Sequence, residues 1–288
     1  FLILGGLALL YWAYINANGI TTVLQTTSRF ETSSAFYQFF FPALTGIIGF
    51  WATLSLNIPD FTRYAKNQRA QVLGQAFGLP TTMTFFAFIG VAVTSSTLIV
   101  YGEAIWDPII LIQKFDNPFI VIFSVITILI ATLTTNVAAN VVGPANDFSN
   151  LAPKYITFKK GGLITGILGI LMMPWKLLAD PTGYVFTWLI GYSALLGPIA
   201  GIILVDYFVI RRTHLNLDAL YQRAGLYSYS QGYNPKAIAA LILGILPNIP
   251  GFLVQIKVCD LPSVLEFLVP LYHYAWFICL FISGVSYI

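Results

Sequence analysis

The sequence predicts an all-α, polytopic membrane protein, and two observations lead to that prediction. Of the 288 residues, 58% are hydrophobic and only 9% are charged, whereas a soluble domain carries about 25% charged residues. A soluble protein needs polar side chains to cover its surface, so this shortage indicates that much of the surface faces hydrocarbon. The apolar residues also fall into runs of membrane length, which favours membrane-spanning helices.

Eight apolar runs are long enough to span a bilayer, since crossing about 30 Å at 1.5 Å per residue takes roughly 20 residues. We expect them at residues 1–20, 39–62, 77–100, 118–142, 161–179, 183–210, 237–256 and 267–288, within one transmembrane domain over residues 1–288. In the loop from Glu103 to Asp116, Trp106 is expected at the headgroup level. Because the chain begins at Phe1 without an initiator Met and stops inside an apolar run, we expect a fragment of a longer protein.

The distribution of charge predicts an orientation. The loops after the second, fourth and sixth spans together hold ten of the fourteen Lys and Arg residues, and basic residues are enriched in cytoplasmic loops. We therefore expect a multi-pass protein of the cell membrane, plasma or inner, in contact with lipid and with its basic loops in the cytoplasm. The net charge of +3 is dispersed along the chain, so we expect no nucleic acid partner.

The second span contains residues that an inert anchor would not need: Pro42, Gly46, Gly49 and Pro59. Irregular backbone at membrane depth survives where it is buried in protein or lines a cavity. Beside Gly49, Trp51 offers a flat face on which a planar ring can stack, with exposed backbone groups expected nearby. The alternatives are kinks for helix packing and a Trp that fills the core. Near the end of the span, Asn57 and Asp60 are expected to be structural.

The fourth span places oxygen groups on one helix face. Ala131, Thr134 and Thr135 fall at positions i, i+3 and i+4, so a backbone carbonyl and two hydroxyls can converge. Such oxygens are hard ligands that suit a small cation, and a neighbouring helix would have to complete the coordination shell. The alternative is that these small residues pack helices closely and that the hydroxyls bond to their own turn.

Asn136 and Asn140 lie one turn apart in the same span, and each amide offers a donor and an acceptor that can match an amide-like edge. At about 100° per residue, an ideal helix places Asn140 nearly opposite Ala131. Either the helix is distorted, or an ion and a substrate occupy separate flanks.

No catalytic constellation is apparent in the sequence. His214 and His273 have no partner spacing that suggests a metal or a nucleophile pair, and the glycines of residues 161–169 lie inside a span rather than in a phosphate loop. Cys259 and Cys279 are too few for a zinc site or a disulfide framework and are expected to be packing residues. We therefore expect neither an enzyme nor an organic cofactor.

Two stretches resemble the nucleobase:cation symporter-1 family: residues 49–66 (GFWATLSLNIPDFTRYAK) and 134–150 (TTNVAANVVGPANDFSN). Residues 101–108 (YGEAIWDP) and 173–181 (MPWKLLADP) look like its allantoin, uracil and hydantoin permease branch. The resemblance covers nearly the whole chain and implies a LeuT-type inverted-repeat transporter fold. It places about eight of twelve transmembrane helices, helices five to twelve, in this C-terminal fragment. The second repeat would cover residues 39–210, followed by two additional helices over residues 237–288.

By position, the resemblance also implies roles for the substrate residues. Trp51 matches the family's stacking Trp on a broken sixth helix, with Gly49 and Phe50 beside it. Phe50 stands where some hydantoin-type members have Gly, which narrows the space next to Trp51. Asn140 matches the Asn that hydrogen-bonds the substrate on the eighth helix, and Asn136 lies one turn away.

The same comparison of positions implies a sodium site. Ala131 matches a ligand that acts through its main-chain carbonyl, and Thr134 and Thr135 match two hydroxyl ligands. A Ser often stands in the family where this chain has Thr134, and the hydroxyl is kept. The remaining ligands of both sites belong to the family's helices one and three, which this chain does not include.

These observations predict a secondary active symporter that takes up a nucleobase-like heterocycle with Na⁺ or H⁺ by alternating access, the substrate being of the allantoin, uracil, cytosine, purine or hydantoin class. Na⁺ is the expected coupling ion. An amino-acid permease of the same fold is an alternative, and it would need a site for a zwitterion rather than Trp51 with Asn140. A membrane-embedded enzyme is an alternative from another class, for which paired acids, bases or metal ligands would be needed.

Overall fold

The computed structural model describes residues 2–25, 28, 30–222, 225–258 and 263–288. Over these residues the secondary structure is helical, apart from one isolated bridge between Ser230 and Tyr233. The chain divides into two compact units. Unit 1 comprises residues 1–29 and 59–167, and unit 2 comprises residues 30–58 and 168–288.

Unit 1 contains α1 (Leu2–Asn16), α2 (Ile20–Leu24), α4 (Pro59–Thr62), α5 (Gln68–Tyr101), α6 (Pro108–Ile112), α7 (Pro118–Asn136), the π-helical turn η1 (Val137–Val141), α8 (Val142–Leu151) and most of α9 (Phe158–Leu171). The longest helix, α5, has a defined start and end. The Asn67 side chain accepts a hydrogen bond from the Ala70 N–H at 2.8 Å, which satisfies a donor of the first turn. Gly102 ends the helix with φ 76°, a left-handed conformation that Gly adopts without strain.

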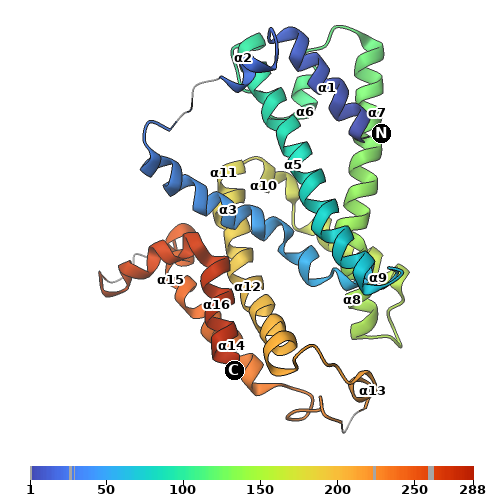
Figure 1. Cartoon of the computed structure of the whole chain (residues 1–288), viewed down its shortest axis with the longest axis vertical. Helices are drawn as coiled ribbons and strands as arrows, with labels where there is room; N and C mark the ends of the chain where they lie inside the picture. The colour runs from blue at the N-terminus through green and yellow to red at the C-terminus, as the bar shows by residue number, and fades with distance from the viewer. Residues whose placement is uncertain (1, 26–27, 29, 223–224, 259–262) are drawn as a thin grey trace. The chain divides into compact units, whose positions relative to one another are not determined.

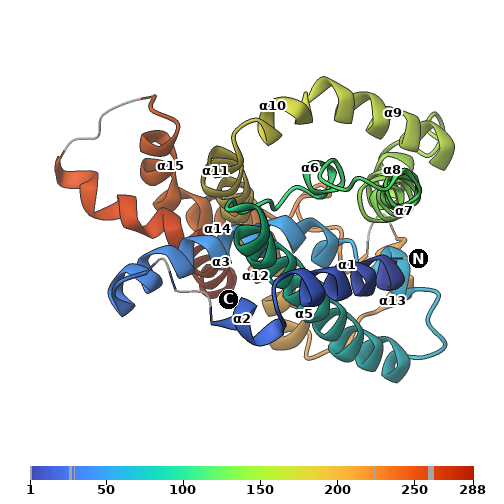
Figure 2. The ribbon, with the colours of Figure 1, turned by 90° about the horizontal axis from the view of Figure 1, so that it is seen from above.

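The core of unit 1 forms where α1 lies against α5 (Figure 1 and Figure 2). Ala13, Ile89 and Val93 are buried at this contact. Trp12 stacks on Tyr101, with ring centroids 6.2 Å apart and planes 17° apart. This aromatic contact joins the end of α5 to the C-terminal half of α1 and so fixes the two helices against each other.

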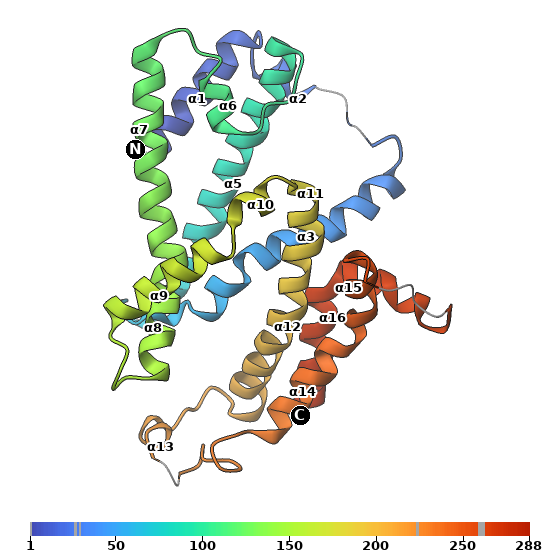
Figure 3. The same ribbon diagram turned by 180° about the vertical axis from the view of Figure 1, so that it is seen from behind.

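Unit 2 contains α3 (Ser33–Leu56), α10 (Pro174–Leu178), α11 (Pro181–Gly183), the π-helical turn η2 (Tyr184–Leu189), α12 (Ile190–Leu204), a second π-helical turn η3 (Val205–Ile210), α13 (Leu217–Leu220), α14 (Pro235–Ile245), the 3₁₀ turn η4 (Leu246–Asn248), α15 (Ile249–Gln255), the 3₁₀ segment η5 (Ser263–Tyr274) and α16 (Ala275–Tyr287). Helices α12, α14 and α16 lie side by side (Figure 3).

Small residues allow the close approach of α12 to α16. A Cβ atom at Gly201 would collide with the carbonyl oxygen of Leu280, and one at Gly197 would lie 2.9 Å from the carbonyl oxygen of Trp276. The Ser283 hydroxyl donates to the Pro198 carbonyl at 3.1 Å. Pro198 has no backbone N–H to donate, and its carbonyl oxygen accepts the hydrogen bond from the Ser283 hydroxyl. This combination of glycines and a hydroxyl is typical of helix contacts in membranes.

Six of the eight predicted spans correspond to helical segments long and apolar enough to cross a membrane: Ser33–Leu56, Gln68–Tyr101, Pro118–Leu151, Pro181–Ile210, Pro235–Gln255 and Leu265–Tyr287. The third span begins about two and a half turns before its predicted start, because the Asn67 cap starts the helix at Gln68. A multi-pass membrane protein is therefore confirmed.

The first and fifth predicted spans are shorter helices than expected. The helix α1 has 15 residues and ends where Asn18 and Gly19 take positive φ angles of 57° and 101°. Within residues 161–179, α9 ends at Leu171, Met173 has φ 49°, and the short helix α10 starts at Pro174. Proline disfavours the α region for the preceding residue, so Pro174 divides an apolar run that composition alone indicates as continuous.

Candidate functional site

The helix that carries Trp51 is continuous through the position where a break was expected. The helix α3 runs from Ser33 to Leu56 and ends at Asn57, whose N–H bonds to the Thr53 carbonyl at 3.1 Å. The next helix, α4, starts at Pro59, which lacks an N–H and cannot continue the ladder of α3. The expected exposed backbone beside Gly49 is therefore wrong: the interruption lies six residues beyond Trp51, at Asn57.

Gly49 is buried against the π-helical turn η2 and the helix α12. A Cβ atom there would collide with the Leu189 carbonyl oxygen and the Ser193 hydroxyl. The fully buried Ser193 hydroxyl donates to the Thr45 carbonyl at 2.9 Å, and the Thr45 hydroxyl donates to the His273 carbonyl at 2.7 Å. Gly49 therefore allows a close helix contact that fixes α3 within unit 2.

We expect Gly49→Ala to destabilise the protein, because backbone and a bonded hydroxyl cannot move aside as a flexible side chain can. Overpacking of this kind costs about 1–3 kcal/mol. Gly90→Ala in α5 is the matched control, since a Cβ there has open space and Ala is the better helix former. The measurement is the thermal unfolding midpoint of both variants, and a midpoint for Gly49→Ala at or above that of Gly90→Ala would contradict this packing role.

Phe50 and Trp51 follow Gly49 on α3 and form an aromatic pair. Their ring centroids are 5.6 Å apart with planes at 80°, the edge-to-face arrangement that aromatic rings favour. Phe50 is 55% exposed and Trp51 is half-buried. Phe50 thus supports the Trp51 indole from one side, which restricts the orientation of the indole.

The helix in the fourth span is distorted between the threonines and Asn140. Residues Val137–Val141 form the π-helical turn η1, in which the Val142 N–H bonds to the Val137 carbonyl five residues back. A turn closed by an i→i+5 bond takes more residues than an α-helical turn, and such π-bulges are frequent at functional sites. It therefore rotates Asn140 back from its ideal position opposite Ala131. Of the two alternatives left open by the sequence, the structure shows the distorted helix.

The two asparagine amides are in direct contact. The Asn140 side-chain NH₂ donates to the Asn136 carbonyl oxygen at 2.6 Å, and both side chains are exposed. This bond leaves the Asn140 carbonyl oxygen and the Asn136 NH₂ group outside it. The pair thus presents one acceptor and one donor, the combination that complements an amide edge.

Thr134 brings its hydroxyl next to the carbonyl of Ala131. The hydroxyl donates to the Ile130 carbonyl at 2.8 Å and lies 3.3 Å from the Ala131 carbonyl oxygen. A hydroxyl that donates its one hydrogen still has lone pairs to offer a cation. Thr134 and Thr135 are both exposed, and Ala131 is half-buried. Over the described part of the chain, no three His, Cys, Asp or Glu side chains gather at a point that could hold a metal ion.

The remaining singled-out residues lie at structural positions. Asn57 and Asp60 stand at the junction of α3 and α4. The His214 ring contacts the carbonyl oxygen of Arg212 through Nδ1 at 2.8 Å, and His273 accepts at its carbonyl from Thr45. Cys279 is buried, as expected for a packing residue, whereas Cys259 lies outside the described residues.

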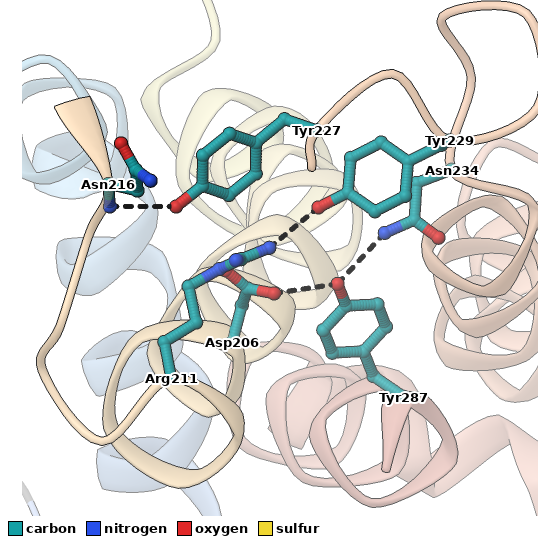
Figure 4. Close-up of polar contacts among 7 residues, drawn as sticks. All are labelled: Asp206, Arg211, Asn216, Tyr227, Tyr229, Asn234 and Tyr287. Carbon is teal, nitrogen blue, oxygen red and sulfur yellow. Dashed lines mark hydrogen bonds and ion pairs between the residues drawn. The ribbon is translucent and has the colours of Figure 1, made fainter. Parts of the chain in front are cut away.

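A polar cluster at the end of α12 was not anticipated from the sequence (Figure 4). The Arg211 guanidinium forms an ion pair with Asp206, donates to the Tyr229 hydroxyl at 2.7 Å and lies 4.4 Å from the Tyr227 ring centroid. The hydrogen bond with Asp206 raises the pKa of the Arg211 guanidinium. Because the ion pair is mostly shielded from solvent, the cluster holds the loop that follows η3 in a defined position.

The same carboxylate joins the C-terminal helix to this loop (Figure 4). The Tyr287 hydroxyl donates to Asp206 at 2.8 Å and accepts from the Asn234 side chain at 2.9 Å. Asn234 also caps α14 by accepting from the Ala237 N–H. The ends of α12, α14 and α16 thus share one hydrogen-bonded network. Asp206 as an acid inside an apolar span was the signal that could have predicted this network.

Comparison with known proteins agrees with this architecture. The family model described as "permease for cytosine/purines, uracil, thiamine, allantoin" matches residues 1–279. The purine-uracil permease NCS1 of Arabidopsis thaliana is 48% identical over 281 residues, which are 97% of this chain and 46% of that protein. The allantoin permease of Bacillus subtilis is 44% identical over 289 residues, which are 100% of this chain and 56% of that protein.

A solved structure has the same fold. The structure of Mhp1, a nucleobase-cation-symport-1 family transporter in a closed conformation with bromovinylhydantoin bound, superposes with a TM-score of 0.70 at 24% identity and covers 100% of this chain and 59% of that one. The inward-facing conformation of Mhp1 gives a TM-score of 0.63 at 23% identity, over 99% of this chain and 58% of that one. The LeuT-type transporter fold is thus confirmed.

The helices and the fold define a multi-pass membrane protein with a transporter fold. The chain belongs to the family of permeases for cytosine and purines, uracil, thiamine and allantoin. Its family is thus one of permeases and not of enzymes. The chain spans about half the length of the relatives it matches, 46% of one and 56% of the other.

Proposed function

We propose that the protein is a secondary active symporter that carries a nucleobase-like heterocycle of the allantoin, uracil, cytosine, purine or hydantoin class, coupled to Na⁺. The family membership supports a heterocyclic substrate rather than an amino acid. The observation that carries the proposal is the π-helical turn η1, because it distorts the helix between the oxygen groups of Ala131 and Thr134 and the Asn140 amide. A distorted helix is thereby placed to serve an ion and a substrate.

The substrate site in this proposal combines an aromatic surface with an amide pair. The heterocycle stacks on Trp51, with Gly49 and Phe50 fixing the position of that indole, and its polar edge pairs with Asn140 and Asn136. Two features support these roles: the edge-to-face contact at 80° that orients the indole and the bonded amide pair that presents both a donor and an acceptor. A planar ring with an amide-like edge satisfies both.

The ion site in this proposal uses the Ala131 carbonyl and the hydroxyls of Thr134 and Thr135. Support comes from the 3.3 Å separation of the Ala131 carbonyl oxygen and the Thr134 hydroxyl oxygen, which lets one cation touch both. Neutral oxygens suit a hard cation. Other parts of the complete protein supply the remaining ligands.

We also propose a place and an orientation for the protein. It lies in the plasma or inner membrane, with the basic loops after the second, fourth and sixth predicted spans in the cytoplasm. The ten Lys and Arg residues of those loops support this orientation.

A binding experiment on the purified complete protein tests the substrate class. Allantoin, uracil, cytosine, hypoxanthine and benzylhydantoin are titrated beside amino acids of similar size. We expect saturable binding of at least one heterocycle and none of the amino acids. Saturable binding of amino acids alone would favour the amino-acid permease, and conversion of a heterocycle to a product would favour an enzyme.

We expect Asn140→Leu to lower heterocycle affinity, because the substrate's polar edge then meets an apolar side chain in a site that excludes water. Leaving such a group unpaired costs about 1–3 kcal/mol. Ring analogues that lack the polar edge should lose much less, so the variant discriminates poorly between substrate and analogue. The measurement is the ratio of the two dissociation constants, with the exposed Asn150→Leu as control. An unchanged ratio in Asn140→Leu would remove this residue from the site.

A further inference from the structure

Unit 2 contains a cavity of about 440 Å³ between the segment from Thr187 to Leu195 on one side and the segment from Ile245 to Ile256 on the other. This volume lies within the roughly 300–1,000 Å³ that ligand pockets occupy. All the lining residues except Ile256 lie in two membrane-spanning segments, Pro181–Ile210 and Pro235–Gln255. The cavity is therefore at membrane depth.

The accessible lining of this cavity is almost wholly apolar. Most of its polar atoms are bonded within the protein, and the Asn248 Oδ1, which has no hydrogen-bond partner among the described residues, is buried. The Thr187 carbonyl accepts from the Tyr272 hydroxyl at 2.7 Å, and the Thr187 hydroxyl accepts from the Gln255 side chain at 3.3 Å. The Asn248 side chain is 1% exposed and contacts the Cys279 sulfur at 2.8 Å. The surface offered to a ligand is consequently hydrocarbon, and a water molecule would lack the polar partners that it needs.

The two walls of the cavity run along the helices. From Thr187 to Leu195, at 1.5 Å per residue, the first wall is about 12 Å long, and from Ile245 to Ile256 the second is about 16 Å. Gly191 widens the middle, since a Cβ there would lie 3.3 Å from the Phe252 ring. Ile256 follows directly after the span that ends at Gln255, so one end of the slot is at the membrane boundary.

A basic residue, Lys257, lies at the end of the slot that is at the membrane boundary. Lys257 follows the lining residue Ile256, is exposed, and has a left-handed backbone with φ 57°. An ammonium group at the end of a span lies at the level of lipid headgroups, where it attracts phosphate. The slot and Lys257 together match a phospholipid: the hydrocarbon walls complement an acyl chain, and the ammonium group complements the phosphate.

We propose that this slot binds one acyl chain of a membrane phospholipid whose phosphate lies at Lys257. The ligand differs in chemistry and place from the proposed heterocycle, because the accessible surface of the slot is almost wholly hydrocarbon and does not complement a polar edge.

Fluorescence of Trp188, which lines the slot, reports occupancy. Delipidated complete protein in detergent is titrated with phosphatidylcholine carrying brominated acyl chains, which quench nearby indoles. The Trp188 contribution is the difference between the wild type and Trp188→Phe. We expect saturable quenching at one lipid per protein, and quenching that rises linearly without saturation would overturn the proposal.

A matched pair of variants locates the site. Leu195 is 53% exposed inside the slot, and Ile203, on the same helix but outside it, is 51% exposed. We expect Leu195→Phe to raise the lipid concentration at half-saturation about tenfold, the effect of expelling roughly two methylene groups, and Ile203→Phe to leave it unchanged. Equal shifts in the two variants would contradict the location. Heterocycle binding by both variants shows that they are folded.

Lys257→Gln tests the headgroup. We expect about fivefold weaker binding of the brominated phospholipid and unchanged binding of a brominated diacylglycerol, which has no phosphate. Equal weakening of both lipids, or of neither, would contradict the phosphate contact. A dimer mass in place of a bound lipid, measured by native mass spectrometry of the delipidated protein, would show that a second copy occupies the slot and would overturn the proposal.

Discussion

Trp51→Ala in the complete protein should weaken heterocycle binding by roughly tenfold to a hundredfold, since stacking on an aromatic side chain is worth about 1–3 kcal/mol per base. The indole is the flat surface of the proposed site, and its edge contact with Phe50 at 5.6 Å fixes its orientation. Truncation removes the surface and also loosens Phe50. The measurement is the dissociation constant of a planar heterocycle by calorimetry or radioligand binding.

The control for this prediction is Trp106→Ala, which removes an indole that is 64% exposed in the loop before α6. Both variants should insert into the membrane and remain folded. Phe50→Ala should give an intermediate loss, because the indole remains but its support does not. Unchanged affinity in Trp51→Ala would refute the stacking role.

Replacing Thr134 and Thr135 together with Ala should abolish the effect of sodium on substrate binding. Linkage requires the coupling to be reciprocal: if sodium tightens substrate binding, the substrate tightens sodium binding by the same factor. Couplings of this kind amount to about 5–150-fold. We expect a factor in that range in the wild type and a factor close to one in the double variant, measured as substrate affinity with and without sodium.

Thr81 and Thr82 provide a matched control, because they are also adjacent threonines in a membrane-spanning helix and also donate to carbonyls of their own turn. The double change Thr81→Ala with Thr82→Ala should leave the sodium effect intact. An undiminished sodium effect in the Thr134 and Thr135 variant would place the ion elsewhere and leave these residues as packing threonines. Absence of a sodium effect in the wild type would favour protons as the coupling ion.

The spans could be predicted from the sequence where composition alone decides, and not where one residue interrupts an apolar run. Six spans follow from hydropathy and length. The run at residues 161–179 is an apolar stretch of span length, yet α9 ends at Leu171, Met173 takes a φ of 49°, and α10 starts only at Pro174. Hydropathy averaged over a window of residues does not reveal the local break that a single proline makes.

The site residues could be placed on their helices, but their contacts could not be predicted. From the sequence, Gly49 indicated exposed backbone at a ligand site, because glycine weakens a helix. Its actual neighbour, Leu189, lies far along the chain, and only the fold brings the two residues together. The π-helical turn at residues Val137–Val141 likewise has no sequence signal of its own. By contrast, Asp206 carried a signal, since an acid in an apolar span must find partners.

The most direct test of the proposed sodium-coupled transport is accumulation of a radiolabelled heterocycle in proteoliposomes that contain the complete protein. With sodium outside only, we expect the internal concentration to rise above the external one and to collapse when sodium is equal on both sides. Uptake that stops at the external concentration under an inward sodium gradient would contradict coupled transport, and accumulation driven by a proton gradient in the absence of sodium would contradict sodium as the coupling ion.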